Sequence, residues 1–412
     1  MTSLFARLPR CVGFVAACCV LPLCGAAQAP VPHVLQANGK TITLSAPDGY
    51  DVSVVADGLR RVRFLAKSPD GRIFATDMFS RADNSRGKVL ILDGWDAAAG
   101  RFTKVTTYLD KLRNPNDVAF YTDDKGQSWL YVPLTDKLVR YRYKAGDVQP
   151  EGEPEVLAHY PAYGLDYKYG GWHLTRTVAF GKVGGRDRMF VAVGSSCNAC
   201  AETEPVRATI SVMDPDGTHS VVLMQHARNA VGLRWDAAGG RLLASNMGDD
   251  QLGDKAPADT LLAVTAAQIA TVESSGKPMD AGWPYCYVQS ASQGAEVRPD
   301  PVWGKDPAAD CPHVLKPMMA FAAHSSPLGV ESLGGGSWLV ALHGAGHPRI
   351  GTGYRVVAVS AKGTQDFVTG FLEQRAGKPV VVGRPCGILQ IAPDEWLVTD
   401  DFLGAVYRIW RK

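Results

Sequence analysis

One pattern of polar and hydrophobic positions recurs along the chain. A polar turn with Asp or Gly is followed by four or five strand-forming residues. The copies read SPDGRIFATD (68–77), TDDKGQSWLYVP (122–133), GGRDRMFVAVG (184–194), AAGGRLLASN (237–246), LGGGSWLVAL (333–342) and APDEWLVTD (392–400). The anchors Ile73, Leu130, Met189, Leu242, Leu339 and Leu397 are spaced by 57, 59, 53, 97 and 58 residues. Each copy precedes a second alternating segment, such as GKVLILD (87–93) or GAVYRIW (404–410). The pattern therefore predicts six strand pairs at nearly regular intervals.

Equal repeats of this length favour a six-bladed β-propeller, in which each repeat is one four-stranded blade. The longer spacing predicts a loop insertion at about 266–327, which holds Cys286 and Cys311. The strand YDVSVVA (50–56) is expected to pair with 404–410, because closing the ring removes the open sheet edges. Six unrelated hairpins in a sandwich or barrel remain the alternative.

The first 29 residues have the pattern of a cleaved signal peptide. Arg7 and Arg10 precede a 14-residue apolar run (11–24), and Ala27-Gln28-Ala29 offers small residues for cleavage. The run is too short for a membrane span, which needs about 18 residues or more. Lipid attachment at Cys24 is a weaker alternative, because Leu23 is bulky. We therefore expect a single propeller domain at 30–412, located in the periplasm or secreted, with no transmembrane segment.

Composition and charge narrow the function. The chain has 43 Lys and Arg against 41 Asp and Glu, so there is no basic excess that would indicate nucleic-acid binding. Cleavage would leave five cysteines, and export favours disulfides. Cys197 and Cys200 form a C-x-x-C for which a small-loop disulfide is favoured over zinc or haem attachment. Cys286 and Cys311 are expected to staple the insertion, and Cys386 to be the spare thiol.

Four segments carry candidate chemistry. GGWHLTRTVAF (170–180) and HARNAVGLRWD (226–236) place His173, Arg176, Arg228 and Asn229 just before predicted blade strands. A histidine there could act as general base and an arginine could bind a carboxylate. GRPCGIL (383–389) places Arg384 in the equivalent position of the last blade. Each residue also has a purely structural interpretation: His173 could cap a strand, Arg228 could form a surface ion pair, and Arg384 could be a turn residue.

The fourth segment, SNMGDDQLGDKAPAD (245–259), is dense in oxygen ligands of the kind that a hard cation requires. It lacks the EF-hand pattern. On composition alone, a solvated acidic loop is the better interpretation of this segment.

Together these segments resemble the soluble quinoprotein sugar dehydrogenases, the glucose/sorbosone dehydrogenase family that binds pyrroloquinoline quinone (PQQ). The similarity covers roughly residues 58–410 and is most specific in RNAVGLRWDAAGGRLLASNMGDDQLGDKAPADTL and DAGWPYCY (280–287). It implies a six-bladed propeller with PQQ and calcium over the central channel.

The resemblance also implies roles for individual residues. His173 matches the catalytic base that takes the proton of the sugar hydroxyl while hydride passes to the quinone. Arg228, Asn229 and Arg384 match cofactor-binding positions, and Arg176 matches one less closely. The backbone carbonyls of Gly248 and Asp249 match the calcium ligands.

Two family positions differ in this chain. The fifth-blade lysine is missing from LVALHGAGHPR, where Arg349 or Arg355 could substitute. The early-blade glutamine is replaced by RNPNDVAF (113–120), with Asn114 or Asn116 as stand-ins.

Three functions follow as hypotheses. The first is a dehydrogenase of an aldose or sorbosone-like sugar that passes electrons to an external acceptor, a cytochrome or a quinone. The second is a calcium-dependent sugar lactonase, with ligands drawn from Asn116, Asn246, Asp249 and Asp400. The third is a ligand-binding propeller without catalysis.

Overall fold

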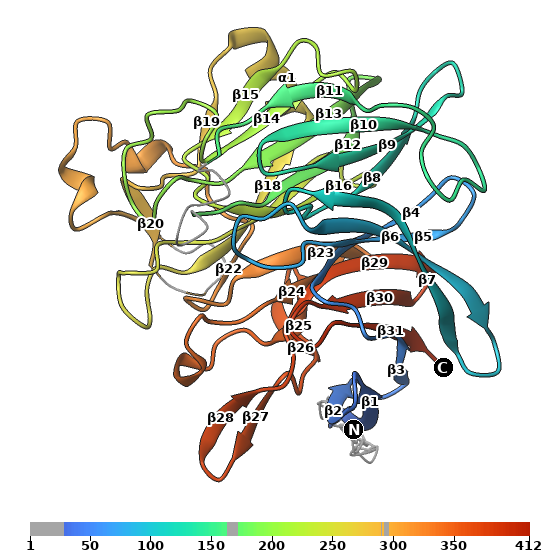
Figure 1. Cartoon of the computed structure of the whole chain (residues 1–412). Coiled ribbons are helices and arrows are strands. Elements are labelled where there is room, and N and C mark those ends of the chain that lie inside the picture. Colours follow the sequence, from blue (N-terminus) through green and yellow to red (C-terminus); the bar gives the residue numbers. More distant parts are fainter. Residues whose placement is uncertain (1–28, 163–171, 290, 292–295) are drawn as a thin grey trace, which may run out of the picture.

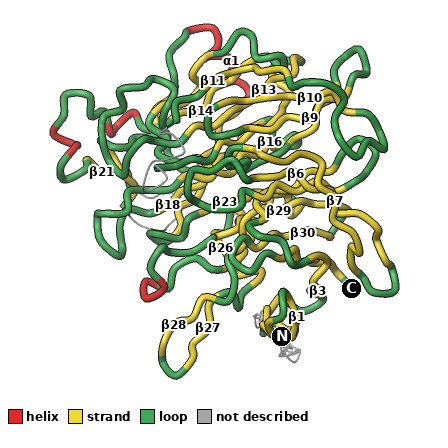
Figure 2. Tube along the Cα trace, in the orientation of Figure 1, coloured by secondary structure: helices red, strands yellow, loops and turns green. Residues whose placement is uncertain are grey.

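The computed structural model describes residues 29–162, 172–289, 291 and 296–412. Residues 1–28 of the expected signal peptide lie outside the described residues. The described chain is built almost entirely of strands, with one α-helix (Figures 1 and 2). No described helix is long and apolar enough to cross a membrane.

Six sheets follow one another as blades, which confirms the predicted six-bladed β-propeller. Each predicted anchor residue lies on the second strand of its blade, because that strand is buried on both faces. Blade 1 contains β4(Val62–Lys67), β5(Ile73–Asp77), β6(Gly87–Asp96) and β7(Arg101–Leu112). Blade 2 contains β8(Ala119–Thr122), β9(Ser128–Pro133), β10(Lys137–Tyr143) and β11(Glu155–His159). Blade 3 contains β12(Arg176–Val183), β13(Arg186–Val193), β14(Thr209–Met213) and β15(Val221–Gln225). Blade 4 begins with β16(Ala230–Asp236), β17(Arg241–Asn246) and β18(Asp259–Thr265). Blade 5 contains β23(Pro327–Gly334), β24(Ser337–Leu342), β25(Arg355–Ser360) and β26(Gly363–Val368). The first three strands of blade 6 are β29(Pro385–Ala392), β30(Glu395–Asp400) and β31(Ala405–Arg411).

The ring closes as expected. The strand β3(Tyr50–Ala56) pairs antiparallel with β31 and completes blade 6, so the start of the propeller lies beside its end (Figure 1). Closure leaves no open edge between the first and last repeat.

The innermost strands β4, β8, β12, β16, β23 and β29 pack side by side around the channel. Glycine allows the closest approaches: a Cβ on Gly232 would lie 1.8 Å from Leu328 O, and one on Gly387 would lie 2.6 Å from Arg63 O. Hydroxyls also join the blades. Thr76 Oγ1 donates to Asn116 O at 2.8 Å, from blade 1 to the strand entry of blade 2. These contacts fix the relative positions of the inner strands and of the loops that lead into them.

The segment between β18 and β23 is more integrated than a simple loop insertion. It gives β19(Met279–Asp280) to blade 3 and β22(Met319–Phe321) to blade 4. Blade 4 therefore receives its fourth strand only after the excursion, a long-range pairing that local pattern does not reveal. The other elements of the excursion are α1(Ala266–Ser275), β20(Cys286–Val288), β21(Val297–Pro299), η1(Trp303–Lys305) and η2(Cys311–His313).

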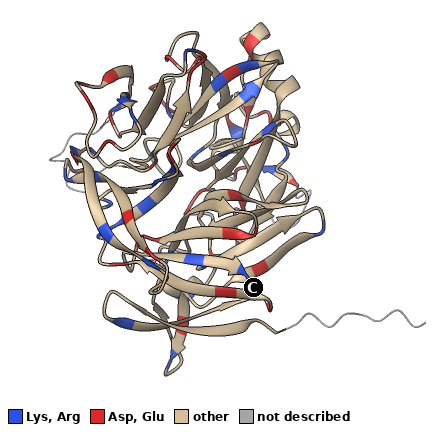
Figure 3. Cartoon of the chain, turned by 90° about the vertical axis from the view of Figure 1, so that its right-hand side faces the viewer, with Lys and Arg blue, Asp and Glu red and all other residues tan. Residues whose placement is uncertain are grey.

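Both predicted disulfides are confirmed, Cys197–Cys200 and Cys286–Cys311, and Cys386 is a buried free thiol. Further elements lie outside the blades: the hairpins β1(Val31–Ala37)–β2(Lys40–Ala46) and β27(Leu372–Arg375)–β28(Lys378–Val381), and the turn η3(Pro348–Ile350). The first hairpin packs Leu35, Ile42 and Leu44 on the core of blades 5 and 6. In the side view of Figure 3, basic and acidic residues are interspersed over the sheets.

Candidate functional site

The loops that lead into the innermost strands surround a cavity of 730 Å³ at one end of the channel. Four predicted site residues line it: His173, Arg228, Asn229 and Arg384. They come from blades 3, 4 and 6, far apart in the sequence. The repeat brings them together because each precedes or begins the first strand of its blade.

His173 lies in the loop before β12 and has a left-handed backbone, with φ of 44°. Its carbonyl accepts a hydrogen bond from Arg176 Nη1 at 2.7 Å, and its Nδ1 lies 2.8 Å from Ser195 Oγ. Burial, and then the positive charge of Arg228, hold the pKa of His173 well below its usual 6.5. The imidazole is therefore neutral near pH 7, as a general base must be.

Arg228 is fully buried beside this histidine, and its guanidinium fixes two loops. It donates to the carbonyl and the side-chain oxygen of Asn198 at 2.8 and 2.7 Å, and to Gly248 O at 2.6 Å. It also forms an ion pair of 2.9 Å with Asp250. Arg228 thus orders one wall of the cavity while its own charge is partly compensated.

Gly248 and Asp249, the predicted calcium ligands, lie behind that wall. They line a separate small cavity of 40 Å³ rather than the large one. The Gly248 carbonyl faces Arg228, and Asp249 Oδ1 accepts from Asn198 Nδ2 and from the Gln251 amide, both at 2.6 Å. A cation bound to that carbonyl would lie near a guanidinium, which disfavours it.

Arg384 occupies the wall formed by blades 5 and 6. Its guanidinium donates to the carbonyls of Gly344 and Ala345 at 3.0 and 2.9 Å, and stacks on the Tyr354 ring. Its backbone amide donates to the buried Asp400. Burial raises the pKa of Asp400 to about 7, against the effect of that amide.

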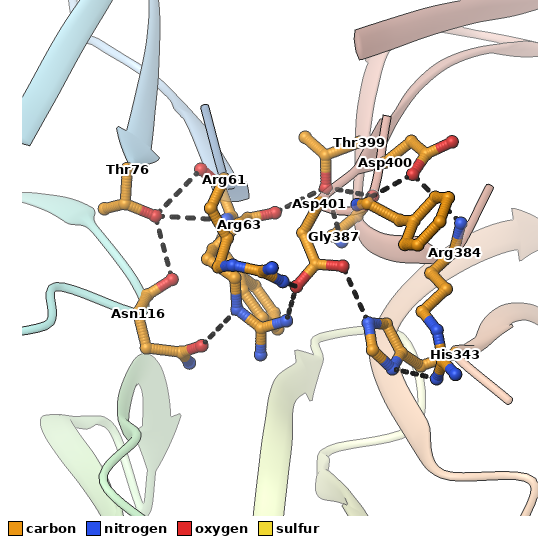
Figure 4. Close-up of polar contacts among 12 residues, drawn as sticks. Arg61, Arg63, Thr76, Asn116, His343, Arg384, Gly387, Thr399, Asp400 and Asp401 are labelled. Carbon is orange, nitrogen blue, oxygen red and sulfur yellow. Dashed lines mark hydrogen bonds and ion pairs between the residues drawn. The ribbon is translucent and has the colours of Figure 1, made fainter. Parts of the chain in front are cut away.

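Asp401, which joins several charged side chains beside the cavity, was not predicted from the sequence as a site residue. This carboxylate is completely buried and forms ion pairs with Arg61 at 3.0 Å and Arg63 at 2.9 Å (Figure 4). Its other oxygen accepts from His343 Nε2 at 2.8 Å. Burial alone would raise the pKa of Asp401, but His343 and the two arginines outweigh it and hold the pKa far below its usual value. The DD pair that ends the last repeat was the available signal.

His343 was also missed, although it lies in the stretch noted for its lack of lysine. It lines the cavity, and its Nδ1 lies 3.4 Å from Arg384 Nη1. Burial lowers the pKa of His343, with Asp401 opposing. A neutral histidine thus lines the cavity in the stretch that contains no lysine.

The stand-ins expected for the two altered positions lie elsewhere. Arg355 pairs with Asp366 at 2.9 Å on blade 5, and neither it nor Arg349 lines the cavity. Asn116 is buried in the channel and accepts from Arg63 Nε at 3.0 Å (Figure 4), while Asn114 donates to Ser80 O and Ala82 O. Both asparagines position neighbouring segments instead of facing the cavity.

Arg176, expected to contact the cofactor, does not line the cavity either. It is 1% exposed, and its guanidinium donates to the His173 and Thr175 carbonyls and to Pro161 O. In this structure it supports the backbone of the His173 loop.

Arg81 lines the cavity and, like Arg63, was not predicted from the sequence as a site residue. It makes no hydrogen bond or ion pair within the part of the chain that the structure describes, although it lines the cavity. Burial, and then the charges of Arg61 and Arg384, lower its pKa. The residue as a whole is exposed, and it lines the wall of the cavity.

The arrangement leaves excess positive charge in the cavity. Arg61, Arg63, Arg81 and Arg384 lie around the single paired carboxylate of Asp401. Four guanidiniums against one carboxylate leave a net excess of three positive charges, and Arg81 and Arg384 have no carboxylate partner of their own among the described residues. An anion with several carboxylates would satisfy them, and PQQ is a tricarboxylate, so the residues present fit this cofactor.

A metal site is less well supported. Among the described residues, the one cluster of three metal-ligating groups is Cys197, Cys200 and Glu202, and those cysteines form a disulfide. Gly248 and Asp249 supply too few oxygen ligands for calcium, which takes about six to eight, unless bound molecules supply the rest.

The closed six-bladed propeller, with a cavity at one end of its channel, is a fold that the chain shares with solved domains of sugar dehydrogenases. The sequence matches the TrAA12-like family model over residues 44–381. The chain belongs to the TrAA12-like family. The predicted resemblance to PQQ-dependent sugar dehydrogenases is thus confirmed, while the match does not name the sorbosone-type branch.

Two solved structures share this fold, and one further protein is similar in sequence. The holo PQQ domain of pyranose dehydrogenase from Coprinopsis cinerea is 20% identical, with a TM-score of 0.68 over 92% of this chain and 100% of that one. The calcium structure of a Trichoderma reesei enzyme of family AA12 is 16% identical, with a TM-score of 0.71 over 89% and 96%. An uncharacterised protein of Borreliella burgdorferi is 22% identical over 90% of this chain and 91% of its own length.

Proposed function

We propose that this protein is an exported, PQQ-dependent sugar dehydrogenase that oxidises an aldose or a sorbosone-like sugar, with His173 as general base. The observation that carries the proposal is the cavity itself. It joins a neutral, accessible imidazole to a cluster of arginines whose charge a tricarboxylate would neutralise.

The residues divide the work between cofactor and substrate. Arg81, Arg384 and Arg63 would hold the carboxylates of PQQ, which supplies an ortho-quinone that accepts hydride when bound. His173 would remove the hydroxyl proton of the sugar as the hydrogen of the same carbon leaves as hydride. For an aldose oxidised at C1, the product is the lactone.

The sugar would pack against Trp172. This side chain lines the cavity, is 42% exposed, and lies with its ring centroid 5.7 Å from that of His173. An exposed indole beside the base offers an apolar face to the C–H groups of a pyranose and a donor to its hydroxyls.

Electrons would leave to an external acceptor at the rim beside blade 1. Arg60 and Arg86 are exposed there, and their guanidiniums stack on the Phe79 ring at 4.0 and 3.7 Å. Phe79 follows Met78, which lines the cavity. This basic rim, consisting of Arg60, Arg81 and Arg86, would favour an anionic acceptor or an acidic face of a cytochrome.

Export completes the proposal. Cleavage after Ala29 would release the 30–412 propeller domain, and the intact mass of the exported protein tests this. Calcium is left out of the proposal, because the Gly248 carbonyl faces Arg228 and too few oxygen ligands surround it. A chelator should therefore leave PQQ binding unchanged in the titration.

The decisive experiment is an optical titration of the metal-stripped mature protein with PQQ, with and without calcium, followed by a panel of aldoses. We expect stoichiometric binding and reduction of the bound quinone by at least one sugar. His173→Ala should bind PQQ but leave it oxidised, while the surface control His219→Ala, 78% exposed in its side chain, should behave as wild type.

Other outcomes point to the competing functions. PQQ binding without reduction by any sugar, in wild type as in His173→Ala, contradicts the dehydrogenase and favours a binding propeller. Hydrolysis of lactones in the absence of PQQ favours the lactonase.

A further inference from the structure

The contacts of His173 Nδ1 define the protonation of its ring. Ser195 Oγ lies 2.8 Å from Nδ1, and Ser195 O lies 3.2 Å from it. A carbonyl oxygen can only accept. The hydroxyl has a single proton, which it donates to Cys197 O at 2.7 Å, so it too must accept from the histidine.

It follows that Nδ1 carries the proton and Nε2 has the free lone pair. No residue in the described part of the chain hydrogen-bonds to Nε2, and His173 lines the cavity. The basic nitrogen is thus the one left available to a substrate.

The geometry around Ser195 is fixed from three directions. Its amide donates to Arg228 O at 2.8 Å, which ties it to blade 4. The Cys197–Cys200 disulfide closes the short loop that presents Cys197 O. Gly194 leaves room for the imidazole, since a Cβ there would lie 2.5 Å from His173 Cβ.

We propose that Ser195 is the positioning residue of His173: its hydroxyl and carbonyl select the Nδ1–H tautomer and aim Nε2 at the sugar hydroxyl. The inference rests on the proposed function. It differs from the usual arrangement, in which a carboxylate orients the base and stabilises its charged form. Here the orienting group is neutral, so it orients the ring without placing a negative charge beside it. Its backbone hydrogen bond offsets only part of the lowering of the His173 pKa by burial and Arg228.

The test compares Ser195→Thr with Ser195→Val, which have the same shape and differ only by the hydroxyl. Any steric cost of the added methyl is therefore common to both. In the cofactor-free protein, ¹⁵N NMR of histidine should show the Nδ1–H tautomer for wild type and S195T. In S195V, the longer contact to the backbone carbonyl alone should leave a mixture of tautomers.

The loaded enzymes should separate in the same way. We expect kcat of S195V to be about tenfold below that of S195T, with KM for the sugar and PQQ affinity alike, as for other groups that orient a reacting side chain. A Nδ1-unprotonated ring in the wild type, or equal tautomers and equal kcat in the two variants, overturns the inference.

The two proposals fail separately. If S195V alters the tautomer but no sugar reduces PQQ in any variant, the positioning role of Ser195 stands as a structural fact and the dehydrogenase proposal falls. If sugars reduce PQQ equally in S195T and S195V, the function stands and the positioning role falls.

Discussion

His343 and Asp401 form a buried pair in which the histidine is neutral. His343 Nδ1 is positioned to accept from Arg384 Nη1, so Nε2 carries the proton and donates to Asp401 Oδ1 at 2.8 Å. The carboxylate therefore keeps its charge for Arg61 and Arg63. A single buried anion thus organises the positive side of the cavity (Figure 4).

Asp401→Asn should destabilise the fold strongly, because it leaves Arg63 buried without its counter-charge. Breaking such a pair costs about 3–5 kcal/mol, measured by denaturant unfolding. The exposed pair Arg355–Asp366 supplies the control: Asp366→Asn should cost less than about 1 kcal/mol. Equal small losses in the two variants would show that Asp401 does not anchor the cluster.

The lowered pKa of Asp401 determines the direction in which the stability of the fold changes with pH. The pKa of Asp401 is lowered in the fold, so its contribution is fully present above about pH 4, where the unfolded carboxyl is ionised. It is lost as the pH falls through the much lower folded value. Wild type should therefore gain stability relative to D401N as the pH rises from acid toward 4, and the difference should then be constant.

Arg81→Gln should weaken PQQ binding without weakening the fold. The guanidinium has no anionic partner among the described residues, and its neighbours Arg61 and Arg384 repel it. Loss of a charge-assisted contact should reduce affinity about 10- to 100-fold in a fluorescence titration. The thermal midpoint should stay constant or rise. Arg375→Gln on the β27–β28 hairpin, where Arg375 pairs with Glu373, should change neither. Unchanged PQQ affinity in R81Q would place the cofactor elsewhere.

The fold was largely predictable because the repeat is local. Buried second strands such as 73–77 and 395–400 recur with their turns, and periodicity alone identified six blades. The fourth strand of blade 4 could not be found in this way. β22 has three residues and pairs with β18 after an excursion of more than fifty, so its pairing depends on tertiary structure.

The site was predictable where it follows the repeat and unpredictable where it depends on burial. His173, Arg228 and Arg384 share the position ahead of an inner strand, and all three line the cavity. Arg176 shares that position too, but its side chain bonds to backbone carbonyls. Asp401 and Arg81 lie in turns after second strands, where a charged residue ordinarily indicates solvent. Only the packed structure shows that one is buried and that the other lacks a partner.

The acid limb of kcat/KM for sugar oxidation should lie below pH 6.5. The neutral form of His173 is the active one, and burial together with Arg228 lowers the pKa at which it is lost. The rate should therefore be constant through neutral pH and fall only as the pH drops through that lowered value. His173→Gln should reduce the rate by about 10²–10⁴ and abolish this limb. A limb at or above 6.5 would mean that another group titrates or that the imidazole is solvated.

Reoxidation of the reduced enzyme should depend on the charge of the acceptor. Arg60 and Arg86 are exposed at the rim and have no carboxylate partner among the described residues. Ferricyanide, a trivalent anion, should react faster at low ionic strength, since the steering potential is screened by salt. Hexaammineruthenium(III), a trivalent cation, should show the opposite trend. Arg86→Gln should slow ferricyanide about two- to fivefold at low salt and flatten its salt dependence. It should leave the reduction of bound PQQ by sugar unchanged, because Arg86 does not line the cavity. Lys362→Gln, on the turn between β25 and β26, is the matched loss of one exposed charge and should alter neither half-reaction. An R86Q variant with wild-type salt dependence would move the electron exit away from blade 1.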